Sequence, residues 1–246
     1  MRVSAVVVSH EGARELESSL PALAPQVDEL LVISNVPGSV PPGVAALENE
    51  RPLGYAANLN LGLARTSGEA LLAVNPDAVA EPGAVGALRD FMAAHDRCGV
   101  AGPRMTFPDG SPQPSRRRFP TVTGTVVRRT PLRRVLPQRR HFHEGEPQPT
   151  EPVQADWMLG GFLLIRRSML EELGGFDEGF RLYGEDIDLQ YRAMRAGWER
   201  WYVPDAVVRH VHQAVTDRRW LTRRTLWHWA GILRFVRKHP ERLRAL

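Results

Sequence analysis

The stretch EALLAVNPDAVAEPG, residues 69–83, contains the pattern on which the fold assignment rests. Its apolar run ALLAV ends at Asn75-Pro76-Asp77, and a proline restricts the residue before it and cannot donate to a strand ladder. The run is therefore predicted to be a buried strand that ends in a turn and presents Asp77 at its carboxyl edge. In open α/β sheets, ligands bind at this edge.

Strand and helix patterns alternate on both sides of this stretch. The apolar runs at 3–9 and 29–35 are predicted strands, and the periodic segments at 13–23, 54–67 and 82–95 are predicted helices. Such alternation is typical of βαβ units in a mainly parallel sheet flanked by helices. The predicted fold class is therefore α/β, with a single Rossmann-like domain.

The second half of the chain has a different character. Between residues 103 and 152, prolines, arginines and glycines replace the periodic pattern, so a long irregular basic loop is predicted there. Regular structure resumes with a buried strand, Phe162 to Ile165, and a helix that starts at its acids and stops at Gly197.

Length and composition limit the class of protein. The chain has 246 residues, of which 43% are hydrophobic and 24% are charged, as is usual for a soluble globular domain. The single cysteine, Cys98, excludes an intramolecular disulfide and suits a reducing compartment. The apolar N-terminal run is too short for a signal peptide, and no apolar segment approaches the roughly 18 to 20 residues that cross a bilayer. We therefore expect a cytoplasmic protein.

The formal net charge of +4 is unevenly distributed along the chain. Residues 116–140 contain nine arginines and no acid, and the segment after Asp217 contains nine basic residues and one acid. Such runs are expected to attract phosphates or an anionic membrane surface. Because Lys238 is the only lysine among 32 basic residues, part of the arginine signal is compositional.

The C-terminal segment, residues 217–246, combines these charges with apolar side chains at helical spacing. This pattern predicts a basic amphipathic helix that lies on an anionic membrane, although the same apolar face is compatible with packing on the domain or in a dimer. The apolar members are Trp220, Leu221, Leu226, Trp227, Trp229, Ile232, Leu233 and Phe235.

Three carboxylates, Glu185, Asp186 and Asp188, occupy the first turn of the predicted helix that ends at Gly197. Taken alone they are explained by capping and by the helix dipole, each contribution being under about 1 kcal/mol. Acids that face a crevice also serve as general bases toward a hydroxyl group.

The combination of motifs resembles the family 2 glycosyltransferases, and most of all the branch of rhamnosyltransferases that act on lipid-linked acceptors. The resemblance covers residues 1 to about 216 and rests on VVVSH, GYAANLNLG, LLAVNPDA, GPRMTFPDGSPQPSRRRFPT, the long segment from DWMLGG to RAMRAGW, and VPDAVVRHVH. It implies a GT-A fold, a nucleotide-sugar donor, Mg²⁺ or Mn²⁺, and inversion at the anomeric carbon.

The same resemblance implies roles for individual residues. Asn-Pro-Asp takes the place of the family's DxD motif, with Asp77 as a metal ligand and Asn75 in the position of the first acid; the alternative is a simple turn. Asp186 matches the catalytic base, with Glu185 as the alternative, and His210 matches a histidine that completes the metal or diphosphate site. His210 and His212 also have the spacing of half a zinc site, which no neighbouring cysteine or histidine completes.

Further residues are implied for the two substrates. On the donor side, Ser34 replaces the family's usual aspartate and Glu11 stands where asparagine is common. Tyr55 is expected near the base of the nucleotide; the alternative for its segment, GYAANLNLG, is helix packing of small residues. The loop around Arg117 falls where the family has a loop that approaches the substrate, and the DW segment borders the acceptor side. The loop arginines are expected to hold the diphosphate of the donor or of a lipid-linked acceptor; the alternative is a solvated loop. The implied donor-binding residues are Ser9, Glu11, Asn35, Asn60, Asn75 and Asp77, and the implied acceptor-side residues are Asp156, Arg116 and Arg118.

These observations predict a GT-A domain at residues 1–216, with a nucleotide-sugar-binding half at 1–102 and an acceptor-side half at 103–216, followed by the tail. The expected activity is transfer of a sugar, rhamnose from dTDP-rhamnose or another from a dTDP- or UDP-sugar, to a glycan or polyprenyl-linked sugar in cell-envelope polysaccharide synthesis. The enzyme is expected at the inner face of the cell membrane. The alternatives are a catalytically silent nucleotide-sugar-binding relative and a basic nucleic-acid-binding protein, which the acidic and histidine motifs disfavour.

Overall fold

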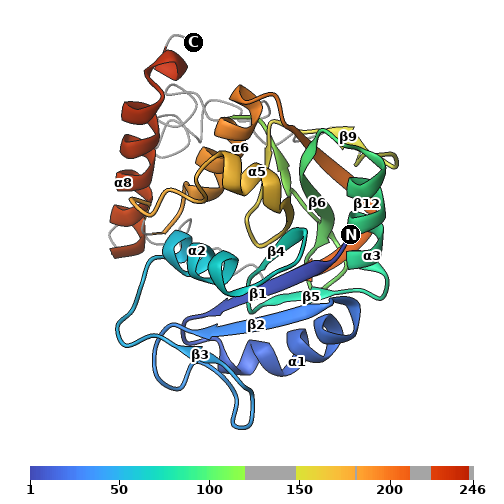
Figure 1. Ribbon diagram of the computed structural model, residues 1–246, viewed down its shortest axis with the longest axis vertical. Coiled ribbons are helices and arrows are strands. Elements are labelled where there is room, and N and C mark those ends of the chain that lie inside the picture. Colours follow the sequence, from blue (N-terminus) through green and yellow to red (C-terminus); the bar gives the residue numbers. More distant parts are fainter. Residues whose placement is uncertain (120–147, 181, 211–222, 244–246) are drawn as a thin grey trace.

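The computed structural model of the chain describes residues 1–119, 148–180, 182–210 and 223–243 (Figure 1). The helices are α1 (Ala13–Leu23), α2 (Tyr55–Arg65), α3 (Ala84–Ala94), α5 (Arg167–Glu172), α6 (Glu185–Arg195) and α8 (Arg223–Lys238). The strands are β1 (Val3–Ser9), β2 (Glu29–Ser34), β3 (Leu47–Glu48), β4 (Ala70–Val74), β5 (Ala78–Ala80), β6 (Cys98–Thr106), β7 (Pro112–Gln113), β8 (Arg116–Arg117), β9 (Val153–Gln154), β10 (Trp157–Met158), β11 (Phe162–Arg166) and β12 (Glu199–His210).

One mixed sheet organises the domain, in the order β3-β2-β1-β4-β11-β6-β12-β5. Strands β3, β2, β1, β4, β6 and β12 run in the same direction, because β11 is antiparallel to both β4 and β6. The carboxyl ends of these strands therefore meet at one edge of the sheet, together with the residues that precede β11.

The sheet separates two hydrophobic clusters. Alternate residues of β1 point to opposite faces, so that Val7 belongs to the cluster under α1 and α3, whereas Val6 belongs to the cluster under α2, α5 and α6. Figure 1 shows α1 and α2 on opposite sides of β1 and β2. Burial on both faces explains the continuous apolar runs in the sequence of these strands.

Two successive arginines at the end of β11 fasten one helix on each face. The guanidinium of Arg166 donates to the carbonyls of Met92, at 2.7 Å, and His95, at 3.0 Å, at the end of α3. The guanidinium of Arg167 donates to the carbonyls of Leu63 and Thr66, each at 2.9 Å, at the end of α2. These arginines therefore cap helix carboxyl termini.

Helix α8 packs beside α6 through an aromatic cluster. Phe235 is buried with Phe119, Trp157, Phe180 and Tyr191. The described part of the basic tail thus buries one apolar face on the domain, which is the alternative to membrane contact that the sequence left open. On its other side, Trp229 is 40% exposed and Leu233 is 49% exposed.

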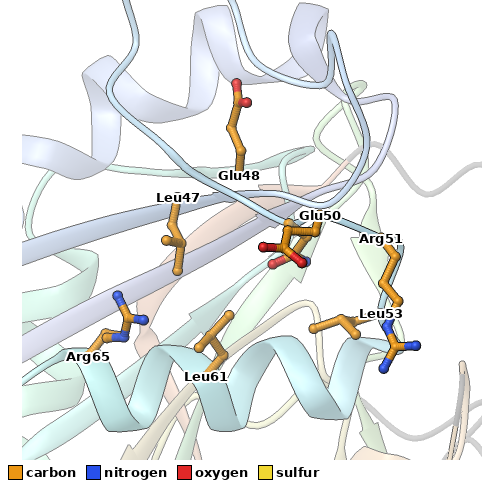
Figure 2. Close-up of a pocket in the computed structure, with 8 residues that line it drawn as sticks. Leu47, Glu48, Glu50, Arg51, Leu53, Leu61 and Arg65 are labelled. Carbon is orange, nitrogen blue, oxygen red and sulfur yellow. The ribbon is translucent and has the colours of Figure 1, made fainter.

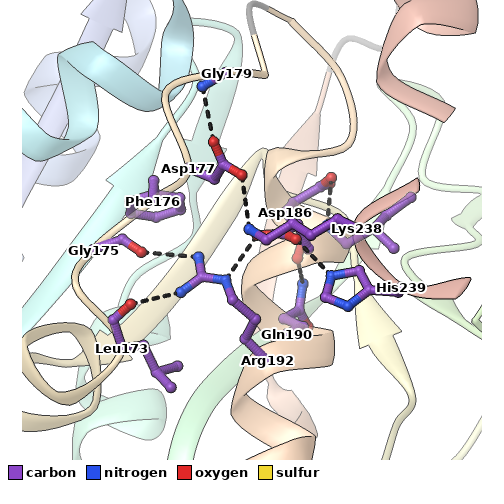
Figure 3. Close-up of polar contacts among 12 residues, drawn as sticks. Leu173, Gly175, Phe176, Asp177, Gly179, Asp186, Gln190, Arg192, Lys238 and His239 are labelled. Carbon is purple, nitrogen blue, oxygen red and sulfur yellow. Dashed lines mark hydrogen bonds and ion pairs between the residues drawn. The ribbon is translucent and has the colours of Figure 1, made fainter. Parts of the chain in front are cut away.

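An ion cluster reinforces this packing. Asp188, whose side chain is fully buried in α6, accepts hydrogen bonds from Lys238 Nζ at 2.9 Å, from His239 Nε2 at 2.8 Å and from Arg192 Nε at 2.8 Å. Lys238 also pairs with Asp177 at 2.7 Å. Figure 3 shows Lys238 reaching between Asp177 and α6, with His239 beside it.

The helices and strands predicted in residues 1–102 are confirmed. The segment expected to be irregular from 103 onward differs at its start, because β6 continues to Thr106 and two short strands, β7 and β8, follow. Residues 120–147 of that segment, like His212, lie outside the described residues. Among the helices of the described residues, none combines the length and hydropathy needed to cross a membrane.

Candidate active site

The residues predicted to carry the chemistry gather at the carboxyl edge of the parallel strands. Asp77 follows β4 within the turn that leads to β5, and His210 is the last residue of β12. Because β12 pairs with β5 in a register that sets His210 opposite Ala78, the histidine is brought next to Asp77. His210 Nε2 lies 3.2 Å from Asp77 Oδ1.

A buried glutamine orients His210 from the other side. His210 Nδ1 lies 3.0 Å from Gln113 Oε1, and both side chains are buried. With the amide oxygen as acceptor, Nδ1 donates to Gln113, and Nε2 faces Asp77. A hydrogen bond of this kind to the distal nitrogen is the usual partner of a metal-binding imidazole.

The pair Gly160-Gly161 lies between Asp186 on one side and His210 and Asn75 on the other. The N–H of Gly160 donates to Asp186 Oδ2 at 3.0 Å, and the carbonyl of Gly161 accepts from the N–H of Asn75 at 2.9 Å. A Cβ atom at Gly160 would lie 3.1 Å from Asp186 Cβ, and one at Gly161 would lie 3.2 Å from His210 Nε2. The side chains of Asp186 and His210 therefore lie close to two glycines that are consecutive in the sequence.

The donor atoms near Asp77 fit a divalent cation with few protein ligands. A carboxylate oxygen and an imidazole nitrogen converge, and Gly161 leaves open the space beside them that a Cβ would fill. Within the described ranges, no group of three or more histidine, cysteine or acidic residues has the geometry to hold a metal. A cation here would take its remaining ligands from phosphate oxygens and water.

The acids at the start of α6 have different environments. Asp186 accepts the N–H groups of Gly160 at 3.0 Å and Ile187 at 2.9 Å. Glu185 is 6% exposed, and its Oε2 has no hydrogen-bond partner among the described residues. The two backbone N–H groups stabilise the ionised form of Asp186, whereas Glu185 Oε2 has no such donor among the described residues.

Both carboxyl groups have raised pKa values. Burial, followed by the neighbouring charge of Asp186, raises the pKa of Glu185 to about 8. Burial also raises the pKa of Asp186, while the N–H groups of Gly160 and Ile187 and the charge of Arg117 act in the opposite direction. The proton shared by such a pair resides on Glu185, which leaves Asp186 as the ionised carboxylate.

Tyr55, the first residue of α2, lies close to these acids. Its hydroxyl oxygen is buried and has no hydrogen-bond partner among the described residues. Burial, and then the charges of Glu185, Asp186 and Asp77, raise the pKa of the Tyr55 phenol. The Tyr55 phenol is therefore close enough to Glu185, Asp186 and Asp77 for their charges to act on it.

Asn35 is the centre of an amide cluster on the donor side. Its Oδ1 accepts from Asn49 Nδ2 at 2.9 Å, Asn58 Nδ2 at 3.1 Å and the N–H of Leu53 at 2.9 Å. Its Nδ2 lies 3.0 Å from His10 Nδ1. This network joins the carboxyl end of β2 to the start of α2, at the edge where Tyr55 lies.

The other predicted donor-side residues lie around this network. The hydroxyl of Ser9 donates to the carbonyl of Ser39, and the hydroxyl of Ser34 lies 3.0 Å from that of Ser39. Ser34, which replaces an acid of the family pattern, thus belongs to a hydroxyl cluster within the loop after β2. Glu11 is exposed and has a φ of 63°, in the left-handed region.

Asn60 points away from the amide cluster. Its Nδ2 donates to the carbonyl of Phe176 and its Oδ1 accepts from the N–H of the same residue, at 2.9 and 2.8 Å. Asn58, two residues earlier, makes the contacts at the sheet edge. A donor-binding role for Asn60 stays a prediction, and the structure adds Asn49 and Asn58 as candidates.

The acceptor-side residues are organised by the pairing of β8 with β10. Asp156 Oδ2 accepts the N–H of Phe119 at 2.9 Å, and Trp157 Nε1 donates to the carbonyl of Arg118 at 2.8 Å. Arg117 is paired with Trp157 in the sheet register and its guanidinium lies 5.2 Å from the indole centroid.

Successive side chains of a strand point to opposite faces, so Arg116 and Arg117 differ in surroundings. The charge of Arg117 acts on Asp186. Burial raises the pKa of Tyr202, and the charges of Arg104 and Arg116 lower it, so Arg116 lies toward β12. Of the two, Arg117 is on the side of the acids.

A separate pocket lies at the β3 edge of the sheet. It is formed between the segment around β3 and the outer side of α2, as Figure 2 shows for Glu50, Arg51, Leu53, Leu61 and Arg65. Asn49 lines it and also bonds to Asn58 at 2.7 Å. The pocket therefore adjoins the Asn35 cluster, several strands away from Asp77 in the sheet order.

Comparison with known proteins gives a consistent result. Residues 41–231 match the family described as Glycosyltransferase like family 2. Over 187 residues, covering 70% of this chain and 60% of the relative, the sequence is 35% identical to an N-acetylglucosaminyl-diphospho-decaprenol L-rhamnosyltransferase of Mycobacterium tuberculosis. It is also 37% identical over 82 residues, 33% of this chain and 30% of the relative, to the rhamnosyltransferase WbbL of Escherichia coli.

Solved structures share the fold at low identity. The structure of GalNAc-T7 with UDP, GalNAc and Mn²⁺ superposes with a TM-score of 0.63 and 18% identity, covering 86% of this chain and 43% of the other. The mannosyltransferase PcManGT from Pyrobaculum calidifontis, in complex with GDP-Man and Mn²⁺, gives 0.61 and 17%, covering 98% and 64%. The chain spans about 60% of the length of the Mycobacterium tuberculosis relative.

Proposed function

Since the chain belongs to the family 2 glycosyltransferases and has a GT-A fold, we propose that it is an inverting transferase that moves a sugar from a nucleotide-sugar donor to an acceptor hydroxyl group. The observation that carries the proposal is the hydrogen bond of Gly160 to Asp186 together with the position of Gly161, at which a Cβ atom would lie 3.2 Å from His210 Nε2. A base and a diphosphate-binding group then flank one small space, as displacement at an anomeric carbon requires.

Asp186 is the base in this reaction. It takes the proton of the acceptor hydroxyl while the acceptor oxygen bonds to the anomeric carbon, and the bond from that carbon to the diphosphate oxygen breaks. One displacement inverts the configuration. The raised pKa of Asp186 makes it a stronger base than an exposed aspartate, and the N–H groups of Gly160 and Ile187 hold its carboxylate in place.

Asp77 and His210 would hold Mg²⁺ or Mn²⁺ at the donor diphosphate. When bound, this cation supplies positive charge that offsets the charge developing on the departing nucleoside diphosphate. The role of this chain is to aim the two ligands, through the β5–β12 pairing and the hydrogen bond between Gln113 and His210.

The names of both relatives give rhamnose as the sugar that they transfer, and that of the Mycobacterium tuberculosis relative also names N-acetylglucosaminyl-diphospho-decaprenol. Together with the family resemblance of the sequence, these names support the following substrates for this chain. The donor would be dTDP-rhamnose, and the acceptor a sugar linked to a polyprenyl diphosphate in cell-envelope polysaccharide synthesis. The amide cluster around Asn35 lies where the nucleoside half would bind, and Arg117, on the side of Asp186, would meet the acceptor diphosphate.

A lipid-linked acceptor also gives the outer side of α8 a role. Trp229 and Leu233, four residues apart and partly exposed, share one side of a helix that contains no acid in its sequence. An aromatic and an aliphatic side chain on a basic helix favour an anionic membrane surface. The enzyme would therefore work at the inner face of the cell membrane.

The test uses the purified full chain with Mn²⁺, a polyprenyl-diphosphate-linked N-acetylglucosamine, and dTDP-rhamnose, UDP-GlcNAc or GDP-mannose. Transfer of rhamnose is expected, with turnover reduced about 10²- to 10⁴-fold in Asp186→Asn while donor binding persists. Donor binding without transfer by the wild-type chain would favour a silent relative instead.

The arginines of the described core give little support to a nucleic-acid-binding protein. Arg166 and Arg167 cap helices, and Arg192 donates to the carbonyls of Leu173 and Gly175, each at 2.9 Å. These guanidinium groups donate hydrogen bonds to backbone carbonyls of the domain and so have a structural role.

A further inference from the structure

Two buried polar groups lie in the region of the proposed base, Asp186. The Tyr55 hydroxyl and Glu185 Oε2 are both buried without a hydrogen-bond partner among the described residues. Leaving such groups unpaired is costly to the folded state, so a folded protein retains them where a ligand completes their hydrogen bonds. The carboxylate of Asp186, by contrast, accepts the backbone N–H groups of Gly160 and Ile187.

The position of Tyr55 identifies the part of the substrate concerned. Its helix begins just after Leu53, whose backbone N–H and carbonyl are bonded to Asn35 at the carboxyl end of β2. The charges of Glu185, Asp186 and Asp77 all act on the Tyr55 phenol and raise its pKa. In the proposed reaction, the diphosphate lies at Asp77 and the acceptor hydroxyl at Asp186, so the transferred sugar occupies the interval between them.

The chemistry of the two groups also fits a sugar. A sugar hydroxyl both donates and accepts, and it matches a phenol or a carboxylic acid, each of which can do the same. Beside Tyr55, the carboxyl groups of Glu185 and Asp186 would instead repel a diphosphate. The sequence placed Tyr55 near the base of the nucleotide and Glu185 as a substitute for Asp186, and the structure supports different roles.

We propose that Tyr55 and Glu185 bind hydroxyl groups of the donor's sugar and so contribute to the choice of sugar. This inference rests on the proposed function, because it requires a nucleotide sugar at Asp77. Glu185 then acts as a hydrogen-bonding acid beside the base, and Tyr55 closes the opposite side of the sugar.

The test compares each nucleotide sugar with the same nucleotide lacking the sugar. Calorimetric titration with Mn²⁺ would use dTDP and dTDP-rhamnose, UDP and UDP-GlcNAc, and GDP and GDP-mannose, and the tightest wild-type pair would be kept. Tyr55→Phe removes only the hydroxyl. It is expected to weaken the nucleotide sugar about 3- to 10-fold, the range of one hydrogen bond, and to leave the nucleoside diphosphate within twofold.

Two further variants separate this role from a loss of packing. Glu185→Gln keeps a donor and an acceptor and should keep most of the affinity, whereas Glu185→Ala should lose it for the nucleotide sugar alone. The matched control is Tyr202→Phe, which removes a hydroxyl that bonds to Gln148 Oε1 at 3.0 Å on β12. It should change neither affinity.

The outcomes are distinguishable. Equal weakening of both ligands by Tyr55→Phe, or an unchanged ratio of the two affinities, would overturn the inference and leave the proposed function standing. A wild-type chain that binds none of the six nucleotides would overturn the proposed function, and this inference with it.

Discussion

Gly160 donates its backbone N–H to the carboxylate of Asp186 at 3.0 Å. The next residue, Gly161, has its open side against His210 Nε2. Consecutive Cα atoms are about 3.8 Å apart, so the short Gly160-Gly161 segment links the position of Asp186 to that of His210. A side chain at either glycine would alter the distance between Asp186 and His210.

The first prediction concerns Gly161→Ala. Its Cβ would lie 3.2 Å from His210 Nε2 and 3.4 Å from Asn75 Nδ2, so the imidazole must shift. We expect turnover to fall by tenfold or more, because small displacements are costly in a positioned site. The control is Gly86→Ala in α3, whose Cβ meets nothing within 4 Å and which should keep full turnover and gain up to about 1 kcal/mol of stability. Equal turnover in both variants would contradict the role of Gly161.

Gln113→Leu should weaken metal binding. Without the amide, His210 Nδ1 loses its 3.0 Å partner, and the orientation and tautomer of the ring are no longer fixed. Loss of such a partner typically lowers metal affinity 10- to 100-fold. The affinity for Mn²⁺ in the presence of nucleoside diphosphate can be followed by electron paramagnetic resonance, with Gln154→Leu, at an exposed position of β9, as control. Identical affinities in the two variants would exclude an orienting role.

Glu185→Gln should stabilise the protein at neutral and alkaline pH. The folded-state pKa of about 8 lies above the usual 4.5, so folding favours the protonated acid, and this contribution is full below about pH 4.5 and is lost as the pH rises to 8. At pH 7 the burial of this acid costs on the order of 3 kcal/mol.

The amide has no proton to lose, so the stability difference between Glu185→Gln and wild type should grow from pH 5 to pH 8 in urea unfolding. The titratable and charged groups whose interactions affect the pKa values of Glu185 and its neighbours are Asp186, Asp77, Tyr55 and Arg117. A difference that does not change with pH would show that Glu185 is not the protonated member of the pair.

Lys238→Met tests the attachment of α8. The ammonium group bonds to both Asp177, at 2.7 Å, and the fully buried Asp188, at 2.9 Å. Its removal should destabilise the domain by about 1 to 2 kcal/mol, because a buried carboxylate loses one of its cations. Arg237→Met, one residue earlier and exposed, should change stability by less than about 0.5 kcal/mol in the same thermal unfolding assay. Similar losses in both would mean that the ion cluster contributes little.

Much of the architecture was predictable from local pattern. The strand that ends at Asn75 and the helix that starts at Glu185 are where the sequence places them, since apolar runs and glycine stops are local signals. The approach of His210 to Asp77 is not local, because it depends on a strand pairing between residues far apart in the chain. Before the structure, only the resemblance to the family predicted that His210 and Asp77 belong to one site.

Two side chains show where sequence reasoning stops. Asn58 and Asn60 lie two positions apart in α2, about 200° around the helix, so they face different surroundings. Both are polar, and periodicity alone did not identify which one meets Asn35. Gln113 lies on a strand of two residues within a segment predicted to be irregular, and its contact with His210 gave no signal in the sequence.

The ion cluster of Asp188 also bears on the order in which the protein is completed. Lys238 and His239 follow Asp188 by 50 and 51 residues. At about 5 to 20 residues per second, a ribosome needs roughly 2.5 to 10 s to make that stretch. The ion cluster of Asp188 is therefore complete only when the end of α8 has been synthesised and docked.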